Sequence, residues 1–366
     1  MPIDQTTEND DAPYGDATAD IGAAEREAPV VHEPGEPRQA GSKSRIGKVL
    51  RDVRDTEELG ILLALAAMVI FVALFHPSFV KIASVSNLLQ QASFYGIIAL
   101  GLVFTLSMGE IDLSVGGNMG FSAVACALFV RGGMDPWFAM VLALLIAMGL
   151  GVLNALVANV FRLQLIIVTL GTLSMYKGAE LVIADGQTVI GGDSESSFFT
   201  FFGGTFHDIP AAAVVFAVLT VVLTLVYRKS AFAFAVRAIG SNPSAARLSG
   251  YPIARIRILV AALTGLLCGV SGVLSYAFFA SVDPSLGTGL ELQAIAAAII
   301  GGTALSGGRG TVPGALLGAL IISVISGGLT TFGVSVNWAD FVTGGVIVGA
   351  VSLDALVKRR QQQLTV

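Results

Sequence analysis

The chain has 366 residues, of which 54% are hydrophobic and 13% charged, and its mean hydropathy is +0.79. A soluble domain carries about 25% charged residues, so this composition excludes a soluble globular protein and places most of the chain in lipid. The net charge of −5 is concentrated at the start: 14 acidic and 7 basic residues precede Leu59, whereas 12 acidic and 14 basic residues make up the rest. The net charge therefore says nothing about a charged ligand.

The first 58 residues differ in character from everything that follows. Residues 1 to about 42 are rich in Asp, Glu, Pro, Ala and Gly and are predicted to be disordered, because they cannot bury enough apolar area to offset their ordering entropy. The acidic start lacks the short apolar core of a signal peptide. The sequence thus predicts residues 1–58 to be a cytoplasmic acidic tail with a basic segment at the membrane surface. The basic residues of this segment are Lys43, Arg45, Lys48, Arg51 and Arg54.

From Leu59 onward, apolar stretches follow one another, and a spanning helix needs roughly 20 predominantly apolar residues. Ten spans are predicted, near 59–75, 87–108, 112–130, 137–160, 163–183, 209–227, 257–279, 291–306, 312–331 and 338–356. The predicted fold class is an all-α integral membrane protein. It is a polytopic bundle of about ten transmembrane helices over residues 59–356, followed by a cytoplasmic tail at 357–366.

The basic residues predict the orientation of this bundle, because Lys and Arg are enriched in cytoplasmic loops. With the N-terminus inside, the cytoplasmic stretches carry Arg162, Arg228, Lys229, Arg237, Arg247, Arg255, Arg257, Arg309, Lys358, Arg359 and Arg360. The outer loops hold only Lys81 and Arg131. Both termini are therefore expected on the cytoplasmic side.

Small residues within the apolar stretches predict close helix packing. Gly265 and Gly269 are four residues apart, as are Gly314 and Gly318, a spacing that lets helix backbones approach closely in lipid. Two cysteines, Cys126 and Cys268, lie in apolar runs and are interpreted as small buried hydrophobic residues rather than a disulfide.

The stretch 227–257 is too polar to span the membrane and contains a strong local helix signal. Asn242 is a favoured N-cap, Pro243 suits the first helical position, Gly250 suits the position after the helix end, and Pro252 prevents continuation. The sequence predicts a short capped helix of about two turns. Such a helix is unstable alone in water, so it must pack against the protein's own spans or dock on a separate protein.

Four segments resemble the permease subunits of ABC importers from the ribose, xylose and arabinose branch, which is related to the branched-chain amino-acid permeases. These are GSNPSAARLSG (240–250), GEIDLSVGG (109–117), VTLGT (168–172) and ELQAIAAAIIGGTALSGGRGTVPGALLGAL (291–320). The resemblance implies a monosaccharide permease that forms a homodimer or heterodimer in the bacterial cytoplasmic membrane. It also implies cytoplasmic ATPase subunits and an extracellular solute-binding protein as partners. The short helix would then be a coupling helix on the ATPase, with these residues involved: Gly240, Asn242, Pro243, Ala246, Arg247, Leu248 and Gly250.

No nucleotide-binding or catalytic motif is visible in the chain, so it is not expected to be an enzyme or to hold a cofactor. The glycine-rich stretch 301–310 lacks the Gly-Lys-Ser/Thr ending of a phosphate loop and is interpreted as a cytoplasmic turn between two spans. ATP and Mg²⁺ are expected on the partner ATPase. The residues assigned to gating or to a structural motif are Glu110, Asp112, Gly301, Gly302, Gly307 and Gly308. For Asp112, a role as N-cap of the third span is the main alternative.

Several polar residues in the predicted spans are candidates for the translocation pathway, because sugar hydroxyls need neutral donors and acceptors. Lys177 and Glu180 are three apart and can pair on one helix face, so Lys177 either pairs or lines a polar path. Each of the others can equally serve an interhelical hydrogen bond. The candidates for the translocation pathway are Gln91, Tyr95, Asn118, Thr169, Lys177 and Gln293.

Two other classes of function remain open from the sequence. A secondary transporter driven by protons or sodium would need carboxylates near the midplane, whereas the carboxylates here lie at predicted span ends. A membrane enzyme would need a catalytic set, and none is recognisable. Within the importer class, a branched-chain amino-acid permease is the alternative.

Overall fold

The computed structural model describes residues 58–192, 195–335, 338, 341–345, 348–349 and 352. Within these residues, seven helices are long and apolar enough to cross a membrane. They are α2 (Glu58–Phe75), α3 (Ile82–Ser107), α5 (Pro136–Phe161), α6 (Leu165–Ile183), α8 (Ala211–Lys229), α11 (Ile253–Phe279) and α13 (Val312–Thr331). The predicted all-α membrane architecture is confirmed. The predictions for residues 1–57 and 353–366 lie outside the described residues.

Two of the predicted spans are shorter helices. α4 (Val115–Arg131) has 17 residues and α12 (Leu290–Ile300) has 11. Eleven residues rise about 16 Å, which is about half of a hydrocarbon core of roughly 30 Å. The predicted span over 291–306 is therefore a half-length helix that ends at the glycine pair 301–302. The tenth predicted span, 338–356, falls mostly outside the described residues, although 341–345 are helical.

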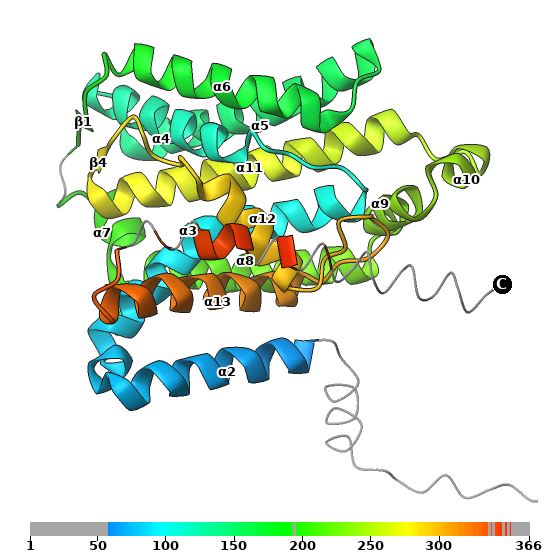
Figure 1. The fold of residues 1–366 in the computed structure, drawn as a ribbon. Coiled ribbons are helices and arrows are strands. Elements are labelled where there is room, and N and C mark those ends of the chain that lie inside the picture. Colours follow the sequence, from blue (N-terminus) through cyan, green and yellow to red (C-terminus); the bar gives the residue numbers. More distant parts are fainter. Residues whose placement is uncertain are drawn as a thin grey trace, which may run out of the picture. The chain divides into compact units, whose positions relative to one another are not determined.

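α3 and α11 form the centre of the helix bundle (Figure 1). α11 packs against α5, α3 and α4, and α3 also packs against α13, α12 and α8. In the most apolar stretch of each helix, 78% of α3 and 67% of α11 is buried, but only 6% of α2. α2 contacts the bundle mainly through α13 and η1 (Pro77–Val80), so most of its apolar surface is left for lipid.

One end of the bundle carries α9 (Ala231–Ser241), α10 (Pro243–Leu248) and the turns 108–114 and 301–311, and is called the α10 end (Figure 1). The opposite, α7 end carries α7 (Ser197–Gly203) and two short antiparallel pairs. β1 (Val189–Ile190) pairs with β4 (Ser281–Val282), and β2 (Thr205–Phe206) pairs with β3 (Ile209–Pro210), with Val189 opposite Val282 and Thr205 opposite Pro210. The basic residues of the α10 end are Arg162, Arg228, Lys229, Arg237, Arg247, Arg255, Arg257 and Arg309.

Glycines set the closeness of the central helix contacts, as predicted. A Cβ added to Gly265 would overlap the carbonyl oxygen of Ala147 in α5, and one added to Gly318 would overlap that of Ala297 in α12. Only a residue without a side chain lets these backbones touch. Cys126 and Cys268 are free and buried, in agreement with their interpretation as apolar filling.

We expect Gly265→Val to lower the melting temperature of the detergent-solubilised protein markedly. The added methyl groups must push α11 away from α5, and overpacking of this kind costs about 1–3 kcal/mol. Gly149→Val is the matched control, because a Cβ at Gly149 in α5 would meet no atom within 4 Å. Equal melting temperatures for the two variants would contradict the role of this contact.

Candidate functional site

α10 is the predicted short capped helix, and it lies at the α10 end with most of its surface uncovered. Asn242 is its N-cap, and its side-chain oxygen accepts a hydrogen bond of 3.0 Å from the amide of Ala245. Gly250 follows the helix with φ +82°, a left-handed conformation that glycine adopts without strain. Ala246 is buried against the bundle, whereas Leu248 is 91% exposed. The exposed leucine and its neighbour Arg247, on a helix held in a fixed position, make α10 a candidate docking element.

α9 connects α10 to the bundle, and the sequence did not predict it. Ser230 caps α9 by accepting a hydrogen bond from the amide of Ala233. One face of α9 is buried, and the helix packs against α8 and α3. The buried residues of α9 are Ala233, Ala235, Val236, Ile239 and Gly240. α10 is therefore supported partly by the protein's own helices, through α9, while its outer surface stays free.

Three glycine-containing segments meet at Gly240: the last turn of α9, the end of α3, and the turn between α12 and α13. A Cβ at Gly240 would overlap the carbonyl oxygen of Ser107, at the end of α3. That oxygen also accepts a hydrogen bond of 2.8 Å from the amide of Gly308, in the turn between α12 and α13. Gly109 and Gly307 pack against the same point with φ of +80° and +82°. The glycine junction (Ser107, Gly109, Gly240, Gly307 and Gly308) thus joins α9, α3 and the predicted turn.

An ion pair lies at the same end, between the segment that follows α3 and the beginning of α11. The Arg257 guanidinium pairs with the Glu110 carboxylate, to which its Nε donates at 2.6 Å, and donates a second hydrogen bond of 2.6 Å to Asn159 of α5. The two charged side chains are only 20% and 14% exposed. The predicted gating residue Glu110 is therefore fixed to two helices.

We expect Arg257→Met to destabilise the protein by about 3–5 kcal/mol, because it leaves the Glu110 carboxylate without its cation in a largely buried position. The double variant Arg257→Met/Glu110→Gln should recover part of that loss, since the unpaired charge is gone. Thermal unfolding of the single and double variants measures both effects. A double variant as unstable as the single one would show that the charge itself is unimportant.

Asp112 supports the start of α4 without capping it. The prediction that Asp112 is the N-cap is wrong: α4 begins at Val115 and its N-cap residue is Ser114. Asp112 accepts hydrogen bonds from the amide of Ser114 at 2.8 Å and from its hydroxyl at 2.6 Å. The Ser114 hydroxyl accepts in turn from Asn154, whose side-chain oxygen accepts from Tyr176 of α6 at 2.8 Å. This buried chain of hydrogen bonds links α4, α5 and α6, and satisfied networks of this kind fix relative helix positions.

Lys177 continues the polar contacts toward the α7 end. Its ammonium group donates hydrogen bonds to the carbonyl of Leu286 at 2.7 Å and to the hydroxyl of Thr288 at 2.8 Å. It also lies 3.8 Å from Glu180, whose carboxylate is fully buried, so the predicted pairing is confirmed. Lys177 thereby ties α6 to the loop that precedes α12. This loop is further ordered at Asp283, whose exposed carboxyl has its pKa lowered by hydrogen bonds from the hydroxyl and amide of Ser285.

The remaining pathway candidates are not gathered in one place. Tyr95 donates a hydrogen bond of 3.1 Å to the carbonyl of Ala319, and Asn118 donates one of 3.0 Å to the carbonyl of Ala147. Both side chains are buried, and each hydrogen bond joins two neighbouring helices. An interhelical hydrogen bond was the alternative to a role in the pathway. Thr169 accepts from the amide of Leu113 and so holds the segment before α4.

Gln91 and Gln293 lie apart from this group. Gln91 is exposed and lines a cavity of about 270 Å³ beside Asn87 and Thr330, between α3 and α13. Gln293 is half-buried in α12. The sequence pointed to polar residues in the membrane without indicating that those of α4, α5 and α6 form one network.

A cavity of about 670 Å³ lies beside α10 and is lined by both this helix and α5. It includes Arg162, Arg247 and Arg257, so it is basic, and an adjoining cavity of about 570 Å³ reaches Glu110 and shares Arg162 and Arg257. The structure thus brings the exposed Leu248, a basic hollow and the buried ion pair to the same end of the bundle. This end of the bundle is therefore the candidate functional surface.

These features define a multi-pass membrane protein whose bundle presents a short, exposed helix at one end. The chain belongs to the ABC-transporter permease family described as branched-chain amino acid transport system / permease component, whose family model matches residues 84–351. No solved structure matches the chain.

Several similar proteins are named as permeases for a sugar. The ribose import permease protein RbsC of Bacillus subtilis is 37% identical over 298 residues, covering 81% of this chain and 92% of the relative. The D-allose transport system permease protein AlsC of Escherichia coli is 32% identical over 305 residues, covering 83% and 93%. The L-arabinose ABC transporter permease protein AraH of Azospirillum brasilense is 29% identical over 307 residues, covering 84% and 90%. The chain therefore spans almost the full length of these proteins.

Proposed function

We propose that this chain is the membrane-spanning permease subunit of a binding-protein-dependent ABC importer that carries a monosaccharide into the cell. The relatives that resemble it over nearly their whole length are named for ribose, allose and arabinose. The description of the family itself mentions branched-chain amino acids. No relative quoted above is named for an amino acid, so the sugar is the better-supported solute.

The observation that carries this proposal is the exposed apolar side chain of Leu248 on a capped helix. An isolated helix of six residues is unstable in water, and here α9 and the N-cap hold it in place. The arrangement suits a coupling helix that enters a groove on a cytoplasmic ATPase subunit. ATP and Mg²⁺ would bind that subunit, and this chain would contribute no catalytic residue and no cofactor.

The proposed orientation places the α10 end in the cytoplasm of a bacterial cell, with the α7 end facing an extracellular solute-binding protein. The α10 end carries eight of the described Lys and Arg residues, whereas Lys81 and Arg131 lie at the α7 end. Positive residues collect on the cytoplasmic side. Both termini would then be cytoplasmic, as the sequence predicted, and a second copy or a homologue would complete the dimeric core.

Reconstitution tests the proposal directly. The chain is purified from its host membrane together with whatever remains bound, and the companions are identified. Proteoliposomes are prepared with the chain in the membrane, the ATPase inside and the binding protein outside. They should accumulate radiolabelled ribose, allose or arabinose only when ATP is enclosed with the ATPase. Leucine serves as the competing solute. Uptake by the chain alone under a proton or sodium gradient would contradict the proposal and favour a secondary transporter.

A further inference from the structure

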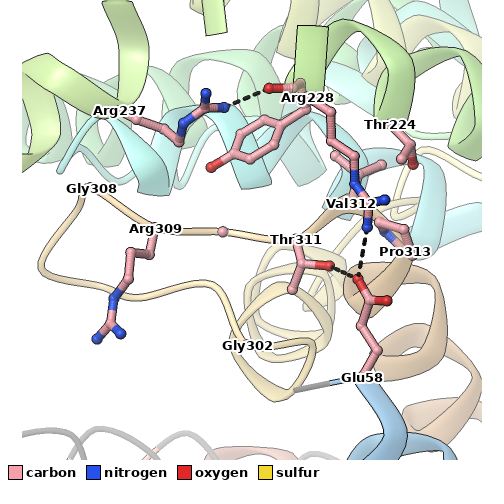
Figure 2. Close-up of a pocket in the computed structure, with 12 residues that line it drawn as sticks. Glu58, Thr224, Arg228, Arg237, Gly302, Gly308, Arg309, Thr311, Val312 and Pro313 are labelled. Atoms are coloured by element: carbon pink, nitrogen blue, oxygen red, sulfur yellow. Dashed lines mark hydrogen bonds and ion pairs between the residues drawn. The ribbon is translucent and has the colours of Figure 1, made fainter. Parts of the chain in front are cut away.

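A separate basic cavity lies at the α10 end, and Figure 2 shows the residues that line it. It has a volume of about 410 Å³ and is enclosed by the start of α2, the end of α8, α9, and the turn that leads into α13. It shares no lining residue with the cavities beside α10. The transport proposal makes no use of it.

The cavity has an excess of positive charge. Among the residues that the structure describes, three guanidinium groups line it, those of Arg228, Arg237 and Arg309, together with one carboxylate, that of Glu58. Arg237 donates a hydrogen bond of 2.5 Å to the carbonyl of Tyr227 and lies 4.9 Å from the centre of the Tyr227 ring, so its position is fixed. Within the described part of the chain, the lining therefore has three positive charges and one negative charge.

Glu58 marks where an anion is held. Its carboxylate oxygen accepts a hydrogen bond of 2.6 Å from the hydroxyl of Thr311 and lies 3.7 Å from Arg228 (Figure 2). Thr311 is the N-cap of the 20-residue helix α13, so the partial positive charge of that helix end adds to the arginines. A guanidinium, a hydroxyl and a helix start together are donors that suit a phosphate group.

Arg309 remains available to a ligand. Its side chain is exposed, and among the residues that the structure describes no hydrogen bond or ion pair is found for its guanidinium group, although its backbone carbonyl accepts a hydrogen bond from the amide of Ala304. In Figure 2 its side chain extends from the turn away from the Glu58 and Arg228 pair. Arg228 is 61% exposed and weakly paired at 3.7 Å. Both arginines can therefore turn toward an incoming anion without breaking a buried contact.

The depth of the cavity indicates where the phosphate would come from. The apolar helices α2, α8 and α13 all begin or end at its rim. Their ends mark the level of the lipid headgroups, and only 6% of the apolar stretch of α2 is buried within the protein. Basic pockets between transmembrane helices at the cytoplasmic surface are known to receive anionic headgroups.

We propose that this cavity binds the phosphate of an anionic phospholipid headgroup, which competes with the Glu58 carboxylate for Arg228 and Thr311. Bound lipid would fasten the start of α2 to α8 and α13. The site is separate from the docking helix and from the buried polar contacts of α4, α5 and α6.

The test measures lipid binding to the delipidated full-length protein in detergent by native mass spectrometry. Phosphatidylglycerol is titrated against phosphatidylcholine with the same acyl chains, and inorganic phosphate is titrated separately. Arg228→Gln/Arg309→Gln should weaken phosphatidylglycerol binding about 30-fold, because each basic residue near a membrane surface accounts for a roughly fivefold gain. Arg255→Gln is the matched control, since Arg255 is exposed at the same end but does not line this cavity. Glu58→Gln should tighten binding, because the competing carboxylate is removed.

The outcomes separate the two sources of phosphate. Preference for phosphatidylglycerol that is lost in the double arginine variant, retained in Arg255→Gln and increased in Glu58→Gln supports the lipid site. Binding of inorganic phosphate with the same dependence on the arginines, but no preference among lipids, supports a phosphate site supplied from solution. Wild-type affinity in the double arginine variant, or no change in Glu58→Gln, overturns the proposal. The Glu58 variant keeps this test valid even if the arginine variant is unstable.

Discussion

Arg247→Glu and Leu248→Asp should each abolish association with the ATPase subunit and ATP-driven uptake, with no change in the amount of protein inserted in the membrane. Leu248 projects from α10 almost fully exposed, so it contributes little to the stability of the isolated chain. Anchors at the centre of an interface contribute at least about 2 kcal/mol each, a roughly 30-fold change in affinity. An aspartate at this position would in addition place an unpaired charge in an apolar groove.

Arg255→Glu provides the control for the charge reversal. Arg255 is exposed at the start of α11 and lies at the same end of the bundle as Arg247, but outside α10. Co-purification of the ATPase with each variant, followed by ATPase and uptake assays in proteoliposomes, measures the effect. Undiminished association of Leu248→Asp with the ATPase would exclude α10 as the coupling helix.

α10 was predictable because its signals are local. Asn242, Pro243 and Gly250 specify a start, a first turn and an end within nine residues, and the structure uses each of them as expected. α9 was missed for a related reason. Its sequence, AFAFAVRAIGS, is dominated by small residues whose burial depends on contacts with α3 and α8, which lie elsewhere in the chain. Its one local signal is Ser230, which caps it.

Hydropathy located the spans but not their lengths. The apolar character of α12 continues past Ile300 into the turn, so composition alone extended it by several residues. Gly302, just after the helix, and Gly307 and Gly308, further along the turn, have positive φ, and a backbone conformation of this kind is not visible in an average of hydropathy. The sequence therefore predicted a full span where the structure has a half-length helix followed by an ordered turn.

The polar contacts could be predicted only as residue types. Asp112 was considered as the N-cap of α4, but Ser114, two residues later, takes that position. Asp112 instead accepts a hydrogen bond from the Ser114 amide. Tyr176 and Asn154 were not recognised as members of the same network, since their partners come from three different helices. Side chains that pair across helices leave no periodic signal in the sequence. In contrast, Lys177 and Glu180 share one helix, and their pairing was predictable from spacing.

These contacts connect the docking helix to the centre of the bundle. α10 follows α9 directly, and Gly240 of α9 touches the carbonyl of Ser107 at the end of α3. The amide of Gly308, in the turn before α13, donates a hydrogen bond to this Ser107 carbonyl. A displacement of α10 must therefore move α3 and the turn together, or open the junction between them. Packed backbones transmit a shift of this kind because they have no side chains that can rearrange to absorb it.

Gly240→Val should consequently damage both the stability of the protein and uptake. The added Cβ would overlap the Ser107 carbonyl and the Gly308 amide, so α9 must separate from both. Overpacking against backbone belongs at or above the upper limit of the usual cost of about 1–3 kcal/mol, a large part of a total stability of about 5–15 kcal/mol. We expect a lower melting temperature and uptake below about a tenth of wild type. A shift of roughly 1.4 kcal/mol already changes the equilibrium between the packed and the separated glycine junction tenfold.

Ala231→Val distinguishes this junction from a general effect of bulk in α9. Ala231 is exposed on the first turn of the same helix, so the two added methyl groups meet solvent rather than backbone. Both variants are compared by thermal unfolding in detergent, by co-purification of the ATPase and by uptake. If Gly240→Val retained the ATPase but lost uptake, the junction would serve transmission as well as stability. Wild-type melting and uptake in Gly240→Val would mean that α9 can leave the glycine junction at no cost, and the connection from α10 to α3 would have to be abandoned.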